Sequence, residues 1–397
     1  MAGYIRTALT TGFLVIVLFF AVLKSGYSFD SITQFLDMLS YNYKGFDIKL
    51  KGITLGEMYD DNVTFDKENK IDDFITILGV GMSAKYEGKT KTLELTANIG
   101  NQTYAKNRDF NNMTQDIAIN FKNELSEYDR MSLKNVFTYT DAPIFFRDDF
   151  FREEQGVTNV DRFTNRFHVD YSRDVFKQLS LTLRYDNDFD TYSGVDFLED
   201  SILNRMGIES NYSITPETSF LFVYDFTTRE FQGGDDASIN TVTTGIRQYI
   251  TRKIYFDGKA GLSFIDTFND ESLIRPALEA ALSYQVDTVT LAKLSFTRNT
   301  VTNPNSANIS DNWRTTASVK QQLSERFRCS LSIFYGEFSS LDSDSNVKLL
   351  GSSALFTYDI NKNLKGNLTY TFLDADSNID TGGYTKNTVF LGLTAEF

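Results

Sequence analysis

The segment that decides the fold is the last one, residues 388–397, which reads TVFLGLTAEF. Leu391 and Leu393 share one face of an extended chain there, whereas Thr394 and Glu396 share the other. Apolar and polar side chains therefore alternate with a period of two, as in a β-strand with two unlike faces. A strand with one face in lipid and the other in water requires this pattern.

The same alternation recurs from about Phe46 onward, and the gaps between the segments are short and long in turn. The short gaps, such as residues 87–90 and 251–253, are long enough only for hairpin turns. The longer gaps are rich in Asp, Asn, Gly and Ser, and they include residues 60–70, 141–160, 188–199, 299–310 and 374–385. Short turns at one rim and long loops at the other are typical of outer-membrane barrels.

We count eighteen segments, or sixteen if two weak ones merge. An even count puts both chain ends at one rim, which is the periplasmic rim for an exported chain. The sequence therefore predicts an all-β protein, a closed antiparallel up-and-down transmembrane β-barrel with short periplasmic turns and long extracellular loops. A soluble β-sandwich is the alternative, but its strands usually have about 5 to 6 residues and these segments are longer. A barrel of this size has room for an aqueous lumen.

The N-terminal region is predicted to hold a signal peptide, residues 1–28. It carries Arg6, an apolar run at residues 13–23 and the small residues Gly26 and Ser28. A membrane anchor is the alternative, but the run is shorter than the ~20 apolar residues of a spanning helix. We expect residues 29–45 to form a short periplasmic link, too short for the plug of an energised receptor, and residues 46–397 to form the barrel.

Composition argues against several classes of function. The formal net charge is −14, and no basic stripe is present to bind nucleic acid. Cys329 is the only cysteine, so no intramolecular disulfide can form, and its parity places it on the lipid face. His168 is the only histidine; Asp170 shares its face, but the spacing identifies no nucleophile. One histidine and one cysteine cannot build a usual zinc site, so we expect neither catalysis nor a cofactor.

The charged residues on the face opposite the apolar stripes are predicted to line the lumen. They are Arg162, Arg166, His168, Asp170, Arg184, Asp186, Arg205, Glu209, Asp225, Arg247, Glu279, Arg314 and Arg328. Two interpretations stay open. The charges form a track that selects solutes, or they pair with cross-strand neighbours as in any hydrated barrel.

The longest gap is a candidate constriction. Residues 144–154 read IFFRDDFFREE, and such paired aromatics are uncommon in a loop wholly in water. In many porins the third long loop folds inward, and this gap is the third. We hypothesise that the aromatics anchor the loop to the inner wall. The charged side chains would then set a field across the lumen; they are Arg147, Asp148, Asp149, Arg152, Glu153 and Glu154.

Two acidic loops have carboxylates at alternate positions, which can converge on calcium. They contain Asp342, Asp344 and Asn346, and Asp374, Asp376, Asn378 and Asp380. Ile379 stands where a helix-flanked calcium loop needs glycine, and no glutamate ends the run. A solvated loop, or divalent ions that bridge to lipid headgroups, is the alternative, and we assign no metal.

Residues 56–63, GEMYDDNV, followed by DDFI at 72–75, resemble the opening of the bacterial outer-membrane β-barrel porin family of the second type. Members often accompany exopolysaccharide or exosortase systems. Relatives usually carry proline-glycine where Leu78-Gly79 stands here. Phe397 is similar to the aromatic end that the barrel-insertion machinery recognises. The resemblance implies the bacterial outer membrane, with its lipids and this machinery as partners.

We expect a passive channel for hydrophilic solutes. One alternative, which the resemblance raises, is an outlet for exopolysaccharide. A second is a structural or adhesive barrel with a closed lumen. The solute or polysaccharide would be the ligand, no nucleic acid is expected, and a homo-oligomer would follow the analogy with trimeric porins.

Overall fold

A computed structural model describes residues 41–43, 45–142, 160–193, 198–233, 236–267, 272–303, 308–341, 343–378 and 383–396. The predicted signal peptide and most of the predicted link lie outside these residues. The elements are β1 (Tyr41–Tyr43), β2 (Phe46–Asp60), β3 (Asp73–Glu87), β4 (Lys91–Tyr104), the 3-10 helix η1 (Arg108–Phe110), β5 (Asn112–Glu124), β6 (Asp129–Thr140), β7 (Asp161–Phe176), β8 (Leu179–Ser193), β9 (Ser201–Thr215), β10 (Thr218–Phe231), β11 (Asp236–Tyr249), β12 (Ile254–Asp266), β13 (Ser272–Gln285), β14 (Thr290–Thr302), β15 (Ile309–Gln322), β16 (Phe327–Ser340), β17 (Asn346–Asp359), β18 (Leu364–Ser377) and β19 (Tyr384–Glu396).

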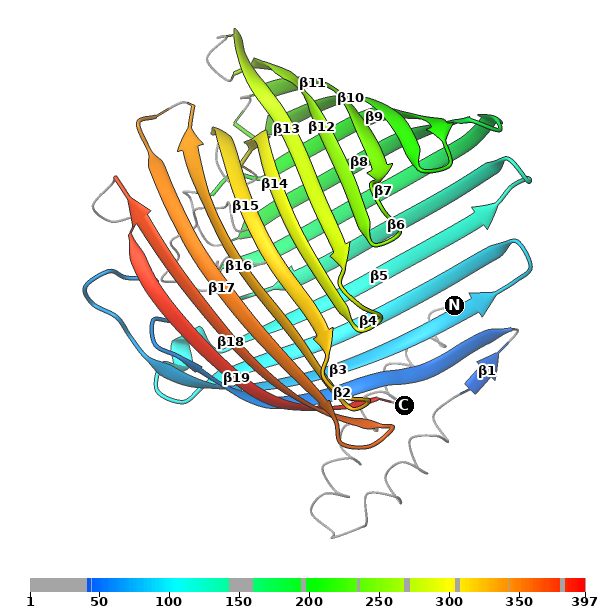
Figure 1. Cartoon of the computed structure of the whole chain (residues 1–397). Coiled ribbons are helices and arrows are strands. Elements are labelled where there is room, and N and C mark those ends of the chain that lie inside the picture. The colour runs from blue at the N-terminus through cyan, green and yellow to red at the C-terminus, as the bar shows by residue number, and fades with distance from the viewer. Residues whose placement is uncertain are drawn as a thin grey trace.

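The strands β2 to β19 form one closed antiparallel barrel (Figure 1). Each strand pairs with the next along the chain, and β19 pairs with β2 from Thr388↔Asp60 to Glu396↔Gly52. The short strand β1 pairs only with the start of β2. The predicted barrel of eighteen strands is therefore confirmed, and the alternative of sixteen is wrong. None of the described helices is long and apolar enough to cross a membrane.

The two faces of the wall differ as the alternation predicts. On β19, Leu391 and Leu393 point outward and are 63% and 48% exposed. Thr394 points into the barrel, where its hydroxyl lies 3.2 Å from that of Thr54 on β2. Cys329 shares the outward face with Leu331, which is also exposed. An apolar exterior around a polar interior is the arrangement that a barrel in lipid requires.

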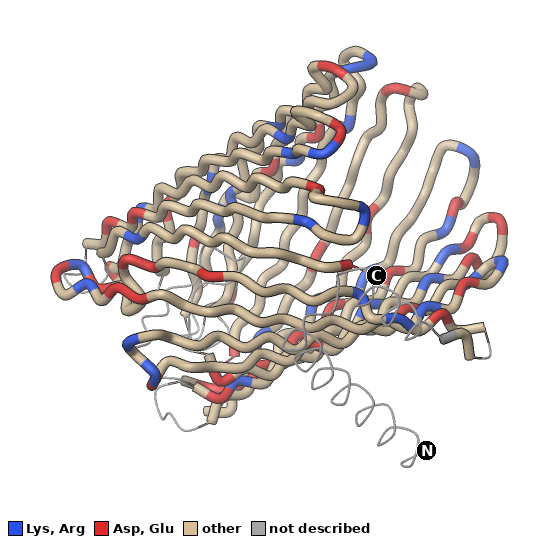
Figure 2. Tube along the Cα trace, turned by 90° about the horizontal axis from the view of Figure 1, so that it is seen from below, with Lys and Arg blue, Asp and Glu red and all other residues tan. Residues whose placement is uncertain are grey.

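The strands extend further toward the long-loop rim than the sequence pattern predicted. Residues 188–193 belong to β8 rather than to a loop, and residues 299–302 belong to β14. At the opposite rim, β7 continues to Phe176 and β8 begins at Leu179, so the turn between them takes only residues 177 and 178. These strand ends carry many polar side chains, which the composition of a loop also has. Charged residues gather at the turns of both rims (Figure 2).

Candidate functional site: the barrel lumen

The most charged part of the lumen is the inner face of β7 to β10, here called the charged wall. Its inward side chains are Arg162, Arg166, His168, Asp170, Arg184, Asp186, Asp188, Asp190, Arg205, Glu209, Asp225 and Arg229. The register brings positive and negative side chains from neighbouring strands together. They form two groups of ion pairs.

The group nearer the long-loop rim is centred on Asp190, whose side chain is fully buried. One carboxylate oxygen of Asp190 lies 3.0 Å from Arg162 Nη2 and 2.7 Å from Arg166 Nη2. The other oxygen lies 4.0 Å from Nη1 of Arg229, which is 2% exposed. Arg166 also reaches Asp188, at 3.5 Å. A single buried carboxylate thus faces three guanidinium groups.

The second group is built around His168. Its Nδ1 lies 2.5 Å from Asp186 and its Nε2 lies 2.7 Å from Asp170. The guanidinium group of Arg184 lies between two carboxylates. Its Nε is 3.5 Å from Asp170, and its Nη2 is 3.6 Å from Glu209. Because both ring nitrogens face carboxylates, the imidazole acts as a bridge within the wall.

The other predicted lumen residues also lie on the inward face but have separate partners. Arg205 Nε donates to the Thr227 hydroxyl at 3.4 Å, and Asp225 lies against Gly207. The remaining contacts are Arg247 with Asp257 at 2.8 Å, Glu279 with Lys259 at 2.8 Å, Arg328 with Asp359 at 2.7 Å, and the Arg314 guanidinium 4.0 Å from the Phe334 ring centroid. Most of these charges therefore pair across strands.

Sequence reasoning missed Asp188 and Asp190 because both fell in a stretch interpreted as a long loop. A signal was present, since Phe189 between them continues the outward apolar parity of β8. Following the alternation into the acidic stretch would have placed both carboxylates inside the barrel.

The opposite side of the lumen carries an apolar cluster on β16 to β19. Its buried members are Phe65, Phe334, Phe338, Val347, Leu349, Ala375 and Tyr384. Phe65 comes from the first long loop, residues 61–72, and adopts a φ of 54°. Its ring lies 5.0 Å from that of Tyr384, edge to face. The first long loop thus folds inward over the lumen.

Polar contacts hold this loop in place. Lys386 Nζ lies 2.7 Å from Asp60 and 3.7 Å from the centre of the Phe65 ring. The fully buried Asn62 donates to the carbonyl of Thr385 at 3.0 Å. Asp66 accepts the backbone N–H groups of two residues that follow it, which lowers the pKa of its carboxyl group.

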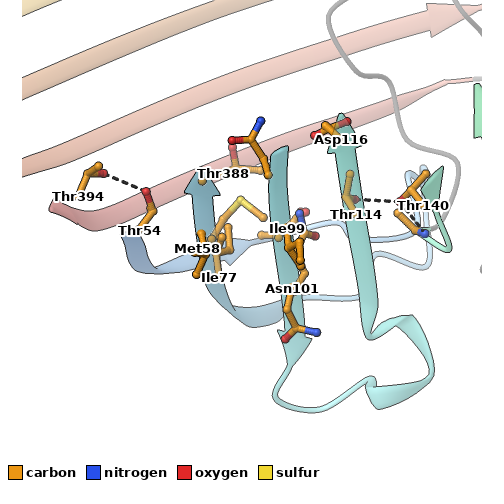
Figure 3. A pocket seen from close by; sticks show the side chains of 18 of the residues that line it. Thr54, Met58, Ile77, Ile99, Asn101, Thr114, Asp116, Thr140, Thr388 and Thr394 are labelled. Carbon is orange, nitrogen blue, oxygen red and sulfur yellow. Dashed lines mark hydrogen bonds between the residues drawn. The ribbon is translucent and has the colours of Figure 1, made fainter. Parts of the chain in front are cut away.

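A cavity of about 790 Å³ lies beside this loop, between β2–β7 and β18–β19 (Figure 3). Inward glycines make room for it, since a Cβ on Gly100 would meet no atom within 4 Å. Hydroxyl groups line it in pairs, such as Thr114 and Thr140 at 2.9 Å. Met58 and Ile77 add apolar surface. Charged side chains of both signs, such as Asp116 and Arg162, also line it, so the cavity can hold a polar solute.

Of two further hypotheses, one falls wholly and the other partly outside the described residues. The constriction at Arg147, Asp148, Asp149, Arg152, Glu153 and Glu154 lies wholly outside them. Of the calcium candidates, Asp342 and Asp380 lie outside as well. Among the residues that the structure describes, no three carboxylate, histidine or cysteine side chains are grouped to hold a metal ion.

No family model and no curated protein matches this chain. Among solved structures, it is similar to the outer membrane protein OpdK from Pseudomonas aeruginosa, with 10% identity and a TM-score of 0.51 over 88% of this chain and 99% of that one. It is also similar to the FrpB iron transporter of Neisseria meningitidis (F3-3 variant), with 8% identity and a TM-score of 0.50 over 89% of this chain and 82% of that one. Both likenesses are of fold. The chain is a barrel of the kind found in outer-membrane proteins.

Proposed function

We propose that this protein is a channel of the bacterial outer membrane through which hydrophilic solutes pass passively. The observation that carries the proposal is the contrast between its two surfaces. The exterior is apolar, whereas the interior carries the charged wall and a cavity of about 790 Å³ whose lining includes hydroxyl, amide and charged groups. Water and small polar solutes can occupy such an interior, and lipid can surround such an exterior.

The proposal includes the partners and selectivity expected from the sequence. The surrounding lipids contact the outward leucines, and the insertion machinery would recognise Phe397. The inward charges, paired as they are, would still set ion selectivity where the passage is narrow. No catalytic step is assigned to His168, because its ring bridges two carboxylates.

An exopolysaccharide outlet is the second candidate, favoured by the cavity's lining. The hydroxyl pair Thr54 and Thr394 and the amides Asn98 and Gln102 could exchange hydrogen bonds with sugar hydroxyls. The family resemblance at residues 56–63 points the same way. Loss of surface polysaccharide on gene deletion, with small-solute permeability intact, would favour this candidate over the first.

Conductance of the purified protein in planar bilayers tests the proposal. We expect discrete single-channel steps, a reversal potential that reports ion selectivity, and block by sugar oligomers. Absence of any steps from folded protein would overturn both channel functions and favour a structural or adhesive barrel whose lumen is closed.

A further inference from the structure

One seam of the barrel wall is paired along only part of its length. The ladder between β13 and β14 runs from Gln285↔Leu291 to Leu278↔Arg298 and stops there. Residues 272–277 of β13 continue to pair with β12, and residues 299–302 of β14 continue to pair with β15. Toward the long-loop rim, the two strands (labelled in Figure 1) are therefore each paired on one side only.

The local sequence suits an unpaired edge. Pro276 lies in the unpaired part of β13 and has no backbone N–H to donate. In a membrane, backbone groups that lack a partner are costly unless protein covers them. The seam must therefore be sealed by something other than a strand ladder.

Side chains provide the seal. Ile309, at the start of β15, is 0% exposed and packs with Ala237, Ile239 and Ile265 of β11 and β12. Leu273 of β13 packs against the same cluster. The end of β14 is tied to the charged wall, because Arg229 Nε on β10 donates to the Thr302 hydroxyl at 2.8 Å. The tip of β14 and β15 is thus held by contacts to side chains of β10 to β13.

We propose that this seam is a lateral gate between the outer part of the lumen and the surrounding membrane, and that it admits amphiphiles with an acyl chain. Separating side chains there breaks no backbone ladder, whereas opening any fully paired seam would. Apolar side chains lie on both sides of the route, next to an ion pair of Arg298 with Asp311 at 2.7 Å where the ladder ends. Ile274 and Leu278 face outward, and the isoleucine cluster lies inside. Arg229 and the charged wall lie next to the inner end and can receive a polar headgroup.

This inference rests on the proposed membrane location, and photo-cross-linking tests it. The protein, with Cys329→Ser, would be placed in nanodiscs that contain a phospholipid with a photoreactive group in its acyl chain. We expect labelling of Ile309 and Leu273, inside the wall, in addition to outward residues such as Leu391. Labelling of outward residues alone would overturn the gate.

A locked variant sharpens the test. If the ladder continued, Pro276 would oppose Thr300, so Pro276→Cys with Thr300→Cys can be joined by a short dithiol-reactive linker. We expect the lock to reduce labelling of Ile309 several-fold and to leave ion conductance unchanged. The matched control is Pro276→Cys with Leu262→Cys, which pair across the complete β12–β13 ladder. Equal labelling in both locked proteins would contradict the proposal.

A variant with a weakened seal should increase the labelling instead of reducing it. Ile309→Ala removes the centre of the seal and should increase labelling of Leu273 several-fold. Leu221→Ala is its control, because Leu221 is equally buried on β10, away from the seam. No increase with Ile309→Ala, in protein that still folds, would also count against the gate. Conductance is recorded separately, so labelling without conductance would keep the gate and refute the channel.

Discussion

The two sides of the lumen are stabilised by different interactions, ion pairs on one side and apolar packing on the other. On the charged wall, Asp190 and its three arginines come from β7, β8 and β10, and their geometry is set by electrostatics. On the facing side, Phe65 and Tyr384 pack in an apolar cluster that the first long loop closes. The comparison suggests a division of labour. In the proposed channel, the charged wall would set which ions pass, and the apolar cluster would set how wide the passage is.

Removal of the Asp190 carboxylate should have the largest effect. Asp190→Asn leaves Arg162, Arg166 and Arg229 without their shared counter-charge, which should destabilise the barrel by about 3 kcal/mol. The reversal potential should shift toward anion selectivity. Asp188→Asn is the control, because that carboxylate is partly exposed and its contact with Arg166 is 3.5 Å long. Similar shifts of the reversal potential in both variants would contradict the assignment of Asp190 as the centre of this group of ion pairs.

Loosening the first long loop should change the width of the passage and leave its ion selectivity as it is. Phe65→Ala removes the ring that packs on Tyr384, at a cost of about 3 kcal/mol, and should raise single-channel conductance while ion selectivity stays constant. Phe74→Ala is the control, because Phe74 points outward and is 54% exposed. An unchanged conductance in Phe65→Ala would mean that the loop does not limit the passage.

Filling the cavity should narrow the passage with little effect on stability. In Gly100→Leu the new Cβ meets no atom within 4 Å and the rest of the side chain extends toward the cavity, so stability should change by no more than about 1 kcal/mol. Conductance and sugar-oligomer block should both decrease. The outward substitution Ala97→Leu on the same strand should change neither of them. Equal currents in the two variants would exclude the cavity from the conduction path.

Removal of an exposed ion pair should have the smallest effect on the stability of the barrel. Arg130 and Asp174 lie 2.8 Å apart at the short-turn rim, and both are solvent accessible. Arg130→Ala should cost less than about 1 kcal/mol, and the cost should decrease with added salt. Chemical denaturation at two salt concentrations would measure it. A loss as large as that of Asp190→Asn would contradict the distinction between buried and exposed pairs.

The wall of the barrel could be predicted from sequence because alternation is a local property. The parity of Leu391 and Leu393 against Thr394 depends on neighbours in the chain alone. The same parity placed Arg162, His168 and the other lumen candidates on the inward face. The parity also holds at Asp188 and Asp190, but the stretch was interpreted as a loop because an acidic strand end has the composition of one.

Contacts between distant parts of the chain could not be predicted from the alternation of apolar and polar residues. Phe65 meets Tyr384 across most of the sequence, and no local signal pairs an aromatic residue of one loop with a strand so far away. The incomplete ladder between β13 and β14 also depends on long-range packing, since Ile309 seals it against Ile265. Pro276 was visible as a residue within a segment, but its place at an unpaired edge was not.

The central claim is that alternate side chains contact hydrocarbon while their neighbours surround a hydrated lumen. Cysteine labelling of Leu391→Cys and Thr388→Cys, in a Cys329→Ser background in lipid vesicles, tests it most directly. We predict that a lipid-soluble thiol reagent modifies Leu391→Cys, whereas a charged, membrane-impermeant reagent modifies Thr388→Cys through the lumen. The reverse preference, or modification of both positions by the charged reagent alone, would contradict the account.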